Sequence, residues 1–185
     1  MKFTKGYWMN LPGVTNTDAV QVREVKVEND RVYLYTVPYH ADMRAMGGPL
    51  LEMYISSPQP DIIRTEAYHF MGGNQKMPAF ELNDAHCALE VENTETTVTI
   101  KSGNTKLVIG KNPCSFDYYY KDKKLTSIGN RFGNAMISTI STPDGNYMRA
   151  QMNLDIGEKV YGLGERFTPY VKNGQTVETW NEDGG

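Results

Sequence analysis

The sequence is short of cysteine and histidine, and the positions of the few it has argue against a metal or redox centre. Cys87 and Cys114 are far apart and do not form the Cys-x-x-Cys spacing that zinc and redox sites use. His40, His69 and His86 lie in separate segments, without the spacing of paired metal ligands. We therefore expect no metal and no other cofactor, and two reduced thiols, with a single disulfide as the alternative.

An excess of positive charge and long hydrophobic runs are also missing. The 19 Lys and Arg residues are nearly balanced by 22 Asp and Glu residues, which leaves no basic stripe for a nucleic acid. No apolar run approaches the roughly 20 residues of a membrane span. Residues 1–8 carry a little charge but have no apolar core behind them. We therefore expect no signal peptide, no membrane partner and a cytoplasmic location.

What the sequence has in quantity is short segments rich in Val, Thr, Ile and Tyr between turn residues. The segments 20–28 and 31–37 flank an Asn-Asp turn, and the segments 96–101 and 105–109 flank a Ser-Gly-Asn turn. Each pair is predicted to form a β-hairpin. Few windows keep apolar residues at helical spacing beyond two turns, so no helix is predicted. The pattern predicts an all-β chain folded as an antiparallel β-sandwich.

The first hairpin carries a sign of an irregular strand. Val20 and Val22 share one parity along the strand, whereas Val25 and Val27 share the other. Because side chains alternate faces in a strand, this slip predicts a β-bulge near Glu24.

The cleanest alternation runs from residue 148 to residue 154. The apolar residues of this segment fall on one face and the polar residues on the other: Met148, Ala150, Met152 and Leu154 against Arg149, Gln151 and Asn153. In an antiparallel sheet with one covered face, the apolar side packs and the polar side meets water. We therefore expect the apolar set to be buried.

The C-terminal stretch combines glycine turns with sugar-compatible side chains. Glycines at 162 and 164 precede Glu165 and Arg166, and glycine allows a sharp turn because it has no Cβ. The residues that follow set an indole, an amide and two carboxylates before a Gly-Gly pair: Trp180, Asn181, Glu182 and Asp183. That combination suits a polyhydroxylated ligand with one apolar face. The alternative is a glycine-punctuated turn with a core tryptophan and a solvated acidic loop.

Two blocks in this stretch, 157–168 and 173–185, resemble the N-terminal domain of glycoside hydrolase family 31. Their sequence is most similar to that of the bacterial α-xylosidase branch. The resemblance implies a galactose-mutarotase-like β-sandwich lying against a (β/α)₈ barrel that carries two catalytic aspartates. A barrel takes ~250 residues. We therefore expect 1–185 to be the N-terminal β-sandwich domain, with 172–185 as a tail leading to the barrel and no catalytic residue of its own.

For the whole enzyme the resemblance implies retaining hydrolysis of terminal non-reducing α-xylosyl residues through a covalent glycosyl-enzyme. It assigns Asp183 to substrate binding, with its carboxylate accepting a hydrogen bond from the sugar in subsite −1. Trp180 and Asn181 would shape that loop, and Glu165 and Arg166 would serve a turn or a domain interface.

Three matters stay open in the sequence. An α-glucosidase of the same family fits the two blocks, because the pocket that separates xylose from glucose belongs mostly to the barrel. A free-standing carbohydrate-binding β-sandwich is a further alternative and would need an exposed aromatic platform. The loop 39–49 has Gly47-Gly48 where similar α-xylosidases carry an aspartate and a threonine, and Asp42 lies too early to replace them, so a homo-oligomer with a trans-subunit contact is left open. This loop and 71–79 are long enough to be mobile or functional.

Overall fold

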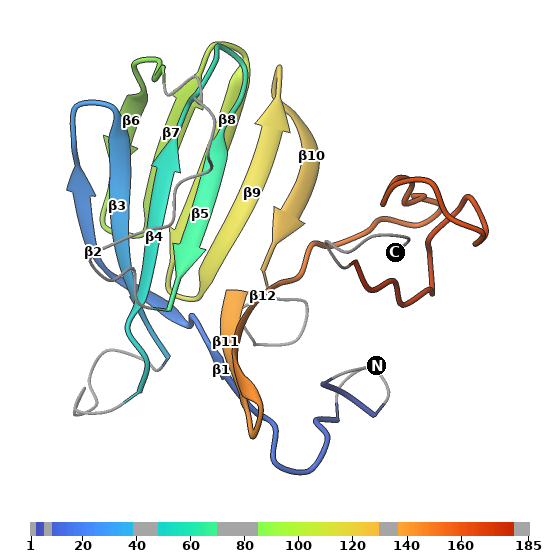
Figure 1. Ribbon diagram of the computed structural model, residues 1–185. Helices are drawn as coiled ribbons and strands as arrows, with labels where there is room; N and C mark the ends of the chain where they lie inside the picture. Colours follow the sequence, from blue (N-terminus) through green and yellow to red (C-terminus); the bar gives the residue numbers. More distant parts are fainter. Residues whose placement is uncertain (1–2, 6–8, 39–47, 70–84, 130–136, 180–185) are drawn as a thin grey trace. The chain divides into compact units, whose positions relative to one another are not determined.

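The computed structural model describes residues 3–5, 9–38, 48–69, 85–129 and 137–179 (Figure 1). This part of the chain contains twelve β-strands and no helix. The strands are β1 (Thr15–Asp18), β2 (Gln21–Val27), β3 (Arg31–Val37), β4 (Leu51–Ser56), β5 (Arg64–Tyr68), β6 (Glu90–Asn93), β7 (Thr97–Ser102), β8 (Thr105–Lys111), β9 (Cys114–Tyr120), β10 (Lys123–Ile128), β11 (Ile137–Thr142) and β12 (Gly145–Ala150).

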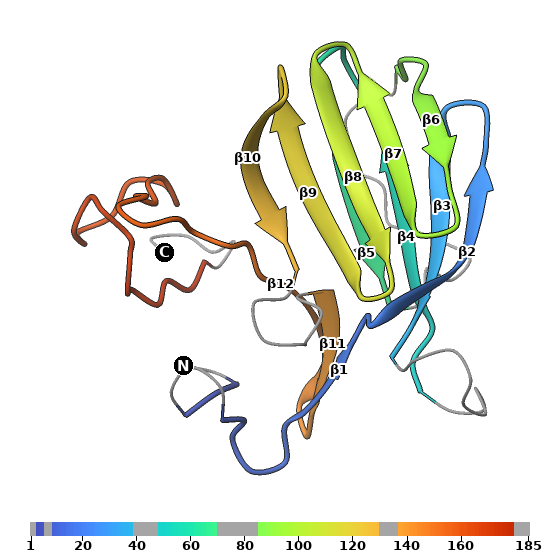
Figure 2. The same ribbon diagram turned by 180° about the vertical axis from the view of Figure 1, so that it is seen from behind.

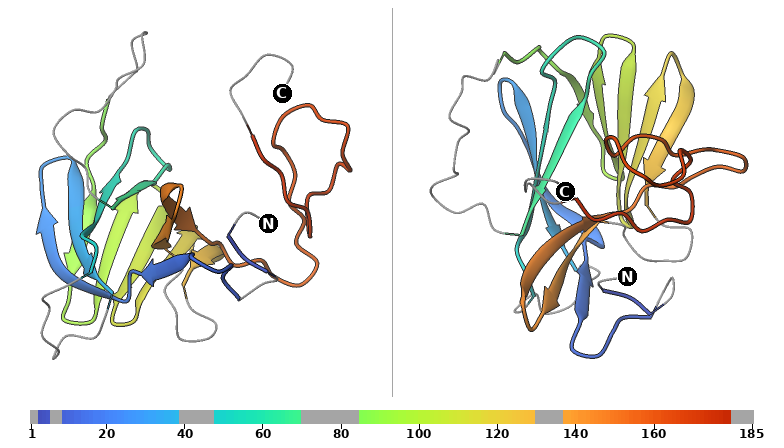
Figure 3. Two further views of the ribbon diagram at one scale, coloured as in Figure 1. Left: turned by 60° about the horizontal axis from the view of Figure 1, so that its bottom comes forward. Right: turned by 45° about the vertical axis from the view of Figure 1, so that its right-hand side comes forward.

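The strands form three antiparallel sheets. One sheet has the order β2-β3-β4-β5, the second has the order β10-β9-β8-β7-β6, and the third is the short sheet β1-β11-β12. The two larger sheets face each other, as Figures 1 and 2 show from opposite sides. The short sheet lies at one end of this sandwich (Figure 3). The predicted all-β antiparallel sandwich is therefore confirmed.

The core lies between the two large sheets, because alternate residues of their strands are apolar and point inward. Val32 and Leu34 of β3 are completely buried, as are Ile100 of β7 and Leu107 and Ile109 of β8. Each such side chain contributes about 1.5–3 kcal/mol when it is fully removed from water. The apolar residues whose alternation predicted the strands are thus the residues that fill the core.

Both predicted hairpins and the predicted bulge are present. β2 pairs with β3, and the register between them shifts between Val22 and Glu24, where the parity of the valines changes. β7 pairs with β8 through the turn that contains Gly103, whose φ is +57°. A side chain at this φ is strained, so the turn needs glycine.

A loop from the opposite sheet clamps the β7–β8 turn. The Asp61 carboxylate, between β4 and β5, accepts hydrogen bonds from the backbone N–H and the side-chain amide of Asn104. The Thr105 hydroxyl donates to the Asp61 carbonyl at 2.6 Å. A Cβ at Gly103 would collide with the Asp61 carboxylate, so the clamp depends on the absence of a side chain there.

The predicted orientation of residues 148–154 is wrong. Met148 and Met152 are exposed, whereas the polar residues Arg149 and Asn153 between and after them are half-buried. The reason lies in cross-strand partners: Arg149 donates to Ser138 on β11 and pairs with Asp18 on β1. These bonds hold the polar face against the sheet and turn the apolar face outward.

The chain divides into two compact units, one of residues 12–153 and the other of residues 1–11 with 154–185. All three sheets belong to the first. In the second, Lys172 donates its backbone N–H to Val160 at 2.8 Å, and its ammonium group donates to Thr168 and to the Pro169 carbonyl. That 1–185 form one domain with 172–185 as a tail to a barrel stays a prediction.

Candidate functional site

The residue assigned to sugar binding, Asp183, lies outside the described residues. Trp180, Asn181 and Glu182 lie outside them too, as do the loop 71–79 and most of the loop 39–49. The assignment of Asp183 therefore stays a prediction.

The glycine turn that precedes this segment is described. Gly162 and Gly164 have φ values of +105° and +77°, and Leu163 between them has +69°. Arg166 donates from Nε to the Leu163 carbonyl at 2.8 Å, which stabilises the turn, while Glu165 is exposed. Of the two roles expected for Arg166, this hydrogen bond supports the turn.

A groove of about 580 Å³ lies among the described residues of the 12–153 unit. It opens between β5 and β10, the edge strands of the two large sheets, with β9, β11 and β12 completing its wall. Its twelve lining residues include eight apolar ones and no Asp or Glu. Glycoside hydrolysis uses a pair of carboxylates, so this groove does not carry that chemistry.

The polar groups of the groove bond within the protein. The Thr65 and Tyr118 hydroxyls lie 2.9 Å apart in a hydrogen bond. Burial raises the pKa of Tyr118 above its usual value, which keeps this hydroxyl protonated. Arg149 is paired as described above, and the Thr126 hydroxyl donates to the Asn153 carbonyl at 3.3 Å.

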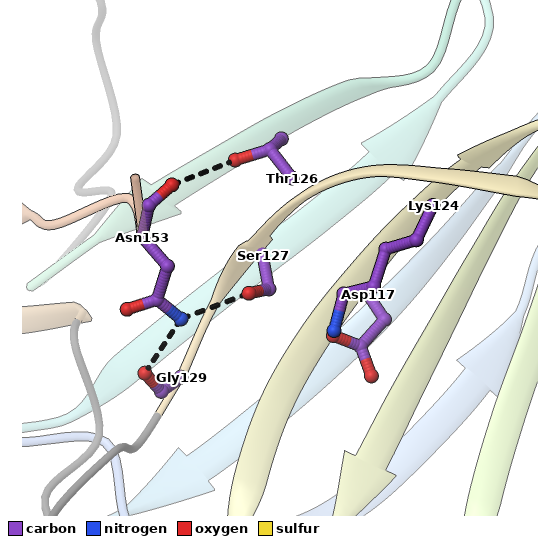
Figure 4. A network of polar contacts seen from close by, with 6 residues as sticks. All are labelled: Asp117, Lys124, Thr126, Ser127, Gly129 and Asn153. Carbon is purple, nitrogen blue, oxygen red and sulfur yellow. Dashed lines mark hydrogen bonds and ion pairs between the residues drawn. The ribbon is translucent and has the colours of Figure 1, made fainter. Parts of the chain in front are cut away.

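Asn153 also fixes the chain that leaves β12 against the edge of β10 (Figure 4). Its backbone N–H donates to the Ser127 carbonyl and its side-chain amide to the Ser127 hydroxyl, both at 2.8 Å. The same amide donates to the Gly129 carbonyl at 3.3 Å. Further along, Lys124 of β10 pairs with Asp117 of β9 at 2.6 Å. The groove is thus bounded on this side by a hydrogen-bonded wall.

The outer face of the β2–β5 sheet carries a cluster of tyrosines. The ring centroids of Tyr33 and Tyr54 lie 5.3 Å apart at a tilted angle, and those of Tyr54 and Tyr68 lie 6.1 Å apart in an edge-to-face arrangement. Arg31 lies over the Tyr54 ring at 4.7 Å, and Lys26 lies over the Tyr33 ring at 5.3 Å. A cation thus lies over two of the three rings, which leaves less open aromatic surface than the platform of a free-standing carbohydrate-binding module.

No metal-binding group of three or more His, Cys, Asp or Glu occurs in the ranges that the structure describes. Within the same ranges, no helix is long and apolar enough to cross a membrane. Cys87 and Cys114 are both free thiols, and burial raises the pKa of Cys114 to about 12.

Sequence reasoning missed the groove, although it noticed the alternating segment that forms one wall. Its signal was the apolar parity of Met148, Ala150 and Met152, all of which line the groove. From that parity the three residues were correctly predicted to share one face, but that face was wrongly predicted to lie in the core.

Comparison with known proteins gives the family. Residues 52–185 match the model of the glycosyl hydrolase 31 N-terminal galactose mutarotase-like domain. Across its whole length the chain is 31% identical to α-xylosidase XylQ of Lactiplantibacillus pentosus and 32% identical to an α-xylosidase of Emericella nidulans. It spans 24% and 26% of these two proteins, about a quarter of their length.

Solved structures share the fold. The cycloalternan-forming enzyme of Listeria monocytogenes, solved with a pentasaccharide substrate, matches 94% of this chain at a TM-score of 0.69 and 19% identity. The match covers 15% of that enzyme. A Flavobacterium johnsoniae dextranase, solved with glucose, matches 90% of this chain and 19% of its own, at a TM-score of 0.68 and 16% identity. Together with the family model and the two α-xylosidases, this fold shows that the chain belongs to glycoside hydrolase family 31 and is its N-terminal galactose-mutarotase-like β-sandwich domain.

Proposed function

We propose that this chain is the N-terminal domain of a retaining α-glycosidase that releases terminal α-xylosyl residues. The supporting observation is the pair of curated α-xylosidases, each aligned with the chain over its full length at 31% and 32% identity. The chain spans about a quarter of either protein, and the proposal places the catalytic residues in the remaining three quarters.

The proposed chemistry needs two carboxylates on a barrel that follows this domain. One attacks the anomeric carbon, and the other protonates the leaving oxygen and later activates water, so that the product keeps the α configuration. Asp183 adds a charged acceptor for a sugar hydroxyl beside that pair. Such a bond strengthens when water is excluded and when positive charge develops on the ring.

An α-glucosidase is the second candidate. The solved relatives include a dextranase and a cycloalternan-forming enzyme, whose names point to glucose-containing substrates. Xylose lacks the hydroxymethyl group of glucose, and a pocket that discriminates by one such group gives roughly 10- to 200-fold preference.

The proposal places the enzyme in the cytoplasm. It leaves open whether the enzyme is a homo-oligomer. Two free thiols suit a reducing compartment.

The deciding experiment uses the protein expressed from its complete reading frame. We expect kcat/KM on p-nitrophenyl α-D-xyloside to exceed that on the α-D-glucoside at least tenfold, with no release by residues 1–185 alone. A preference for the glucoside would replace the proposal with the second candidate. Proton NMR of the first product should show the α anomer, and a β anomer would reject the retaining mechanism.

A further inference from the structure

The groove displays an apolar stripe that stays exposed among the described residues of the 12–153 unit. Leu125, Met148 and Met152 line it and are 53%, 39% and 57% exposed. Single exposed apolar residues are common and need no explanation. These three line one groove, with Met148 and Met152 at the same parity of β12 and the segment after it and Leu125 on β10, so one occupant can contact all of them.

The orientation of that strand is fixed, so the stripe is not the accidental result of a loose segment. Arg149 is bonded to Ser138 and Asp18, and Asn153 is bonded to Ser127. Turning the methionines inward would break these bonds and leave the buried Ser138 hydroxyl without its Arg149 partner. The apolar face therefore stays outward until something covers it.

The groove is unsuited to a sugar. A sugar site needs a few polar groups free to bond the hydroxyls. Here the Thr65 and Tyr118 hydroxyls bond each other, Arg149 is paired within its own sheet, and no carboxylate is among the described residues of the wall. An occupant of this groove gains its affinity from apolar contact, as the side chains of a folded protein surface do.

The size of the groove favours an occupant in the same polypeptide. Its described lining comprises twelve residues, whereas a stable interface between separate proteins uses about 20–30 residues on each side. A tethered surface binds through a small contact because the tether raises its effective concentration. The curated relatives supply such a surface, since three quarters of their length lies outside the region aligned with this chain.

We propose that the groove between β5 and β10 seats apolar side chains from the catalytic part of the same polypeptide, with Leu125, Met148 and Met152 as the contact stripe. The inference rests on the proposed function, in that it takes this chain to be one domain of a longer enzyme. It adds which surface of the domain carries the contact.

Hydroxyl-radical footprinting tests the contact directly. The oxidation rates of Met148 and Met152 are compared between the 185-residue chain and the protein from the complete reading frame. We expect at least a tenfold fall at both methionines in the longer protein. Val27, 56% exposed on β2, is the matched control and should change less than twofold. Equal methionine rates in the two proteins overturn the proposal.

The same measurement separates other occupants. Protection in the 185-residue chain that grows with protein concentration indicates a second copy and overturns the proposal. Protection of that chain by added xylose, glucose or maltotriose indicates a sugar and also overturns it.

A pair of variants gives a second readout. Met152→Glu should lower the melting temperature of the longer protein or split its transition in two, and should leave the 185-residue chain unchanged. Val27→Glu should change neither. These readouts do not depend on enzyme activity, so the two proposals can fail separately. A longer protein with protected methionines and no glycosidase activity would reject the proposed function and support the contact. An active enzyme with fully reactive methionines would support the function and reject the contact.

Discussion

Substituting alanine for Gly103 tests the clamp that joins the two large sheets. Its φ of +57° costs an L-residue about 1–2 kcal/mol. The new Cβ would also push away the Asp61 carboxylate, which accepts two hydrogen bonds from Asn104. A hydrogen bond to a charged group contributes about 1.5–3 kcal/mol, and the exposed position of this pair places it at the lower end of that range. We expect a total loss of about 2.5–3.5 kcal/mol.

Gly13→Ala is the matched control. Gly13 has a φ of +79° in the same unit, but a Cβ there meets only Pro143 at an ordinary 3.4 Å. It should therefore cost the backbone term alone, about 1–2 kcal/mol. Urea unfolding followed by circular dichroism measures both variants, and the difference between them reports the lost clamp.

A double-mutant cycle isolates the collision. In an Asp61→Ala background the carboxylate is gone, so Gly103→Ala should cost no more than Gly13→Ala does. If Gly103→Ala matches Gly13→Ala in the unmutated background as well, the carboxylate does not clamp the turn and the reasoning is refuted.

Three further predictions concern thiols, pH and substrate. Cys87 should react with a disulfide reagent at pH 8 while buried Cys114 should not, and two fast thiols without denaturant would contradict this. Burial raises the pKa of Cys114 to about 12, and burial with the hydrogen bond to Glu52 raises that of Tyr33 to about 12 as well. Because both groups release their protons more readily when unfolded, stability should be complete below about pH 9 and fall between pH 9 and 12; a flat unfolding free energy over that range would refute it. In the complete enzyme, Asp183→Asn should lower kcat/KM roughly ten- to more than a hundredfold, since the lost bond to a charged acceptor contributes ~1.5–3 kcal/mol, whereas Glu182→Gln should do little. Wild-type kcat/KM in the Asp183 variant would reject its assignment to the sugar.

The parts of the fold that local chemistry dictates could be predicted from the sequence. The β7–β8 hairpin follows from a Ser-Gly-Asn turn between two alternating segments, and the structure has glycine at the position that needs positive φ. The bulge in β2 follows from four valines that change parity, because a strand cannot place both pairs on one face without an extra residue. Each of these inferences uses residues fewer than ten positions apart.

The orientation of residues 148–154 could not be predicted in this way. Alternation shows that two faces differ, but it does not show which one meets the sheet body. That choice was made by Asp18, 131 positions away from Arg149 in the chain. A partner so distant is invisible to any local pattern, so the apolar face was assigned to the core by default.

The outward orientation of the apolar face of residues 148–154 is nevertheless informative about function. An apolar strand face that packs inward says only that the domain has a core. An apolar face held outward by bonds on its polar side is the observation on which the proposed domain contact rests. The described lining of the groove includes no carboxylate, and its Thr65 and Tyr118 hydroxyls bond each other, which separates that role from sugar chemistry. The proposed sugar contact at Asp183 and the proposed domain contact at Met148 and Met152 lie on different segments of the chain, so we expect that each can be removed without the other.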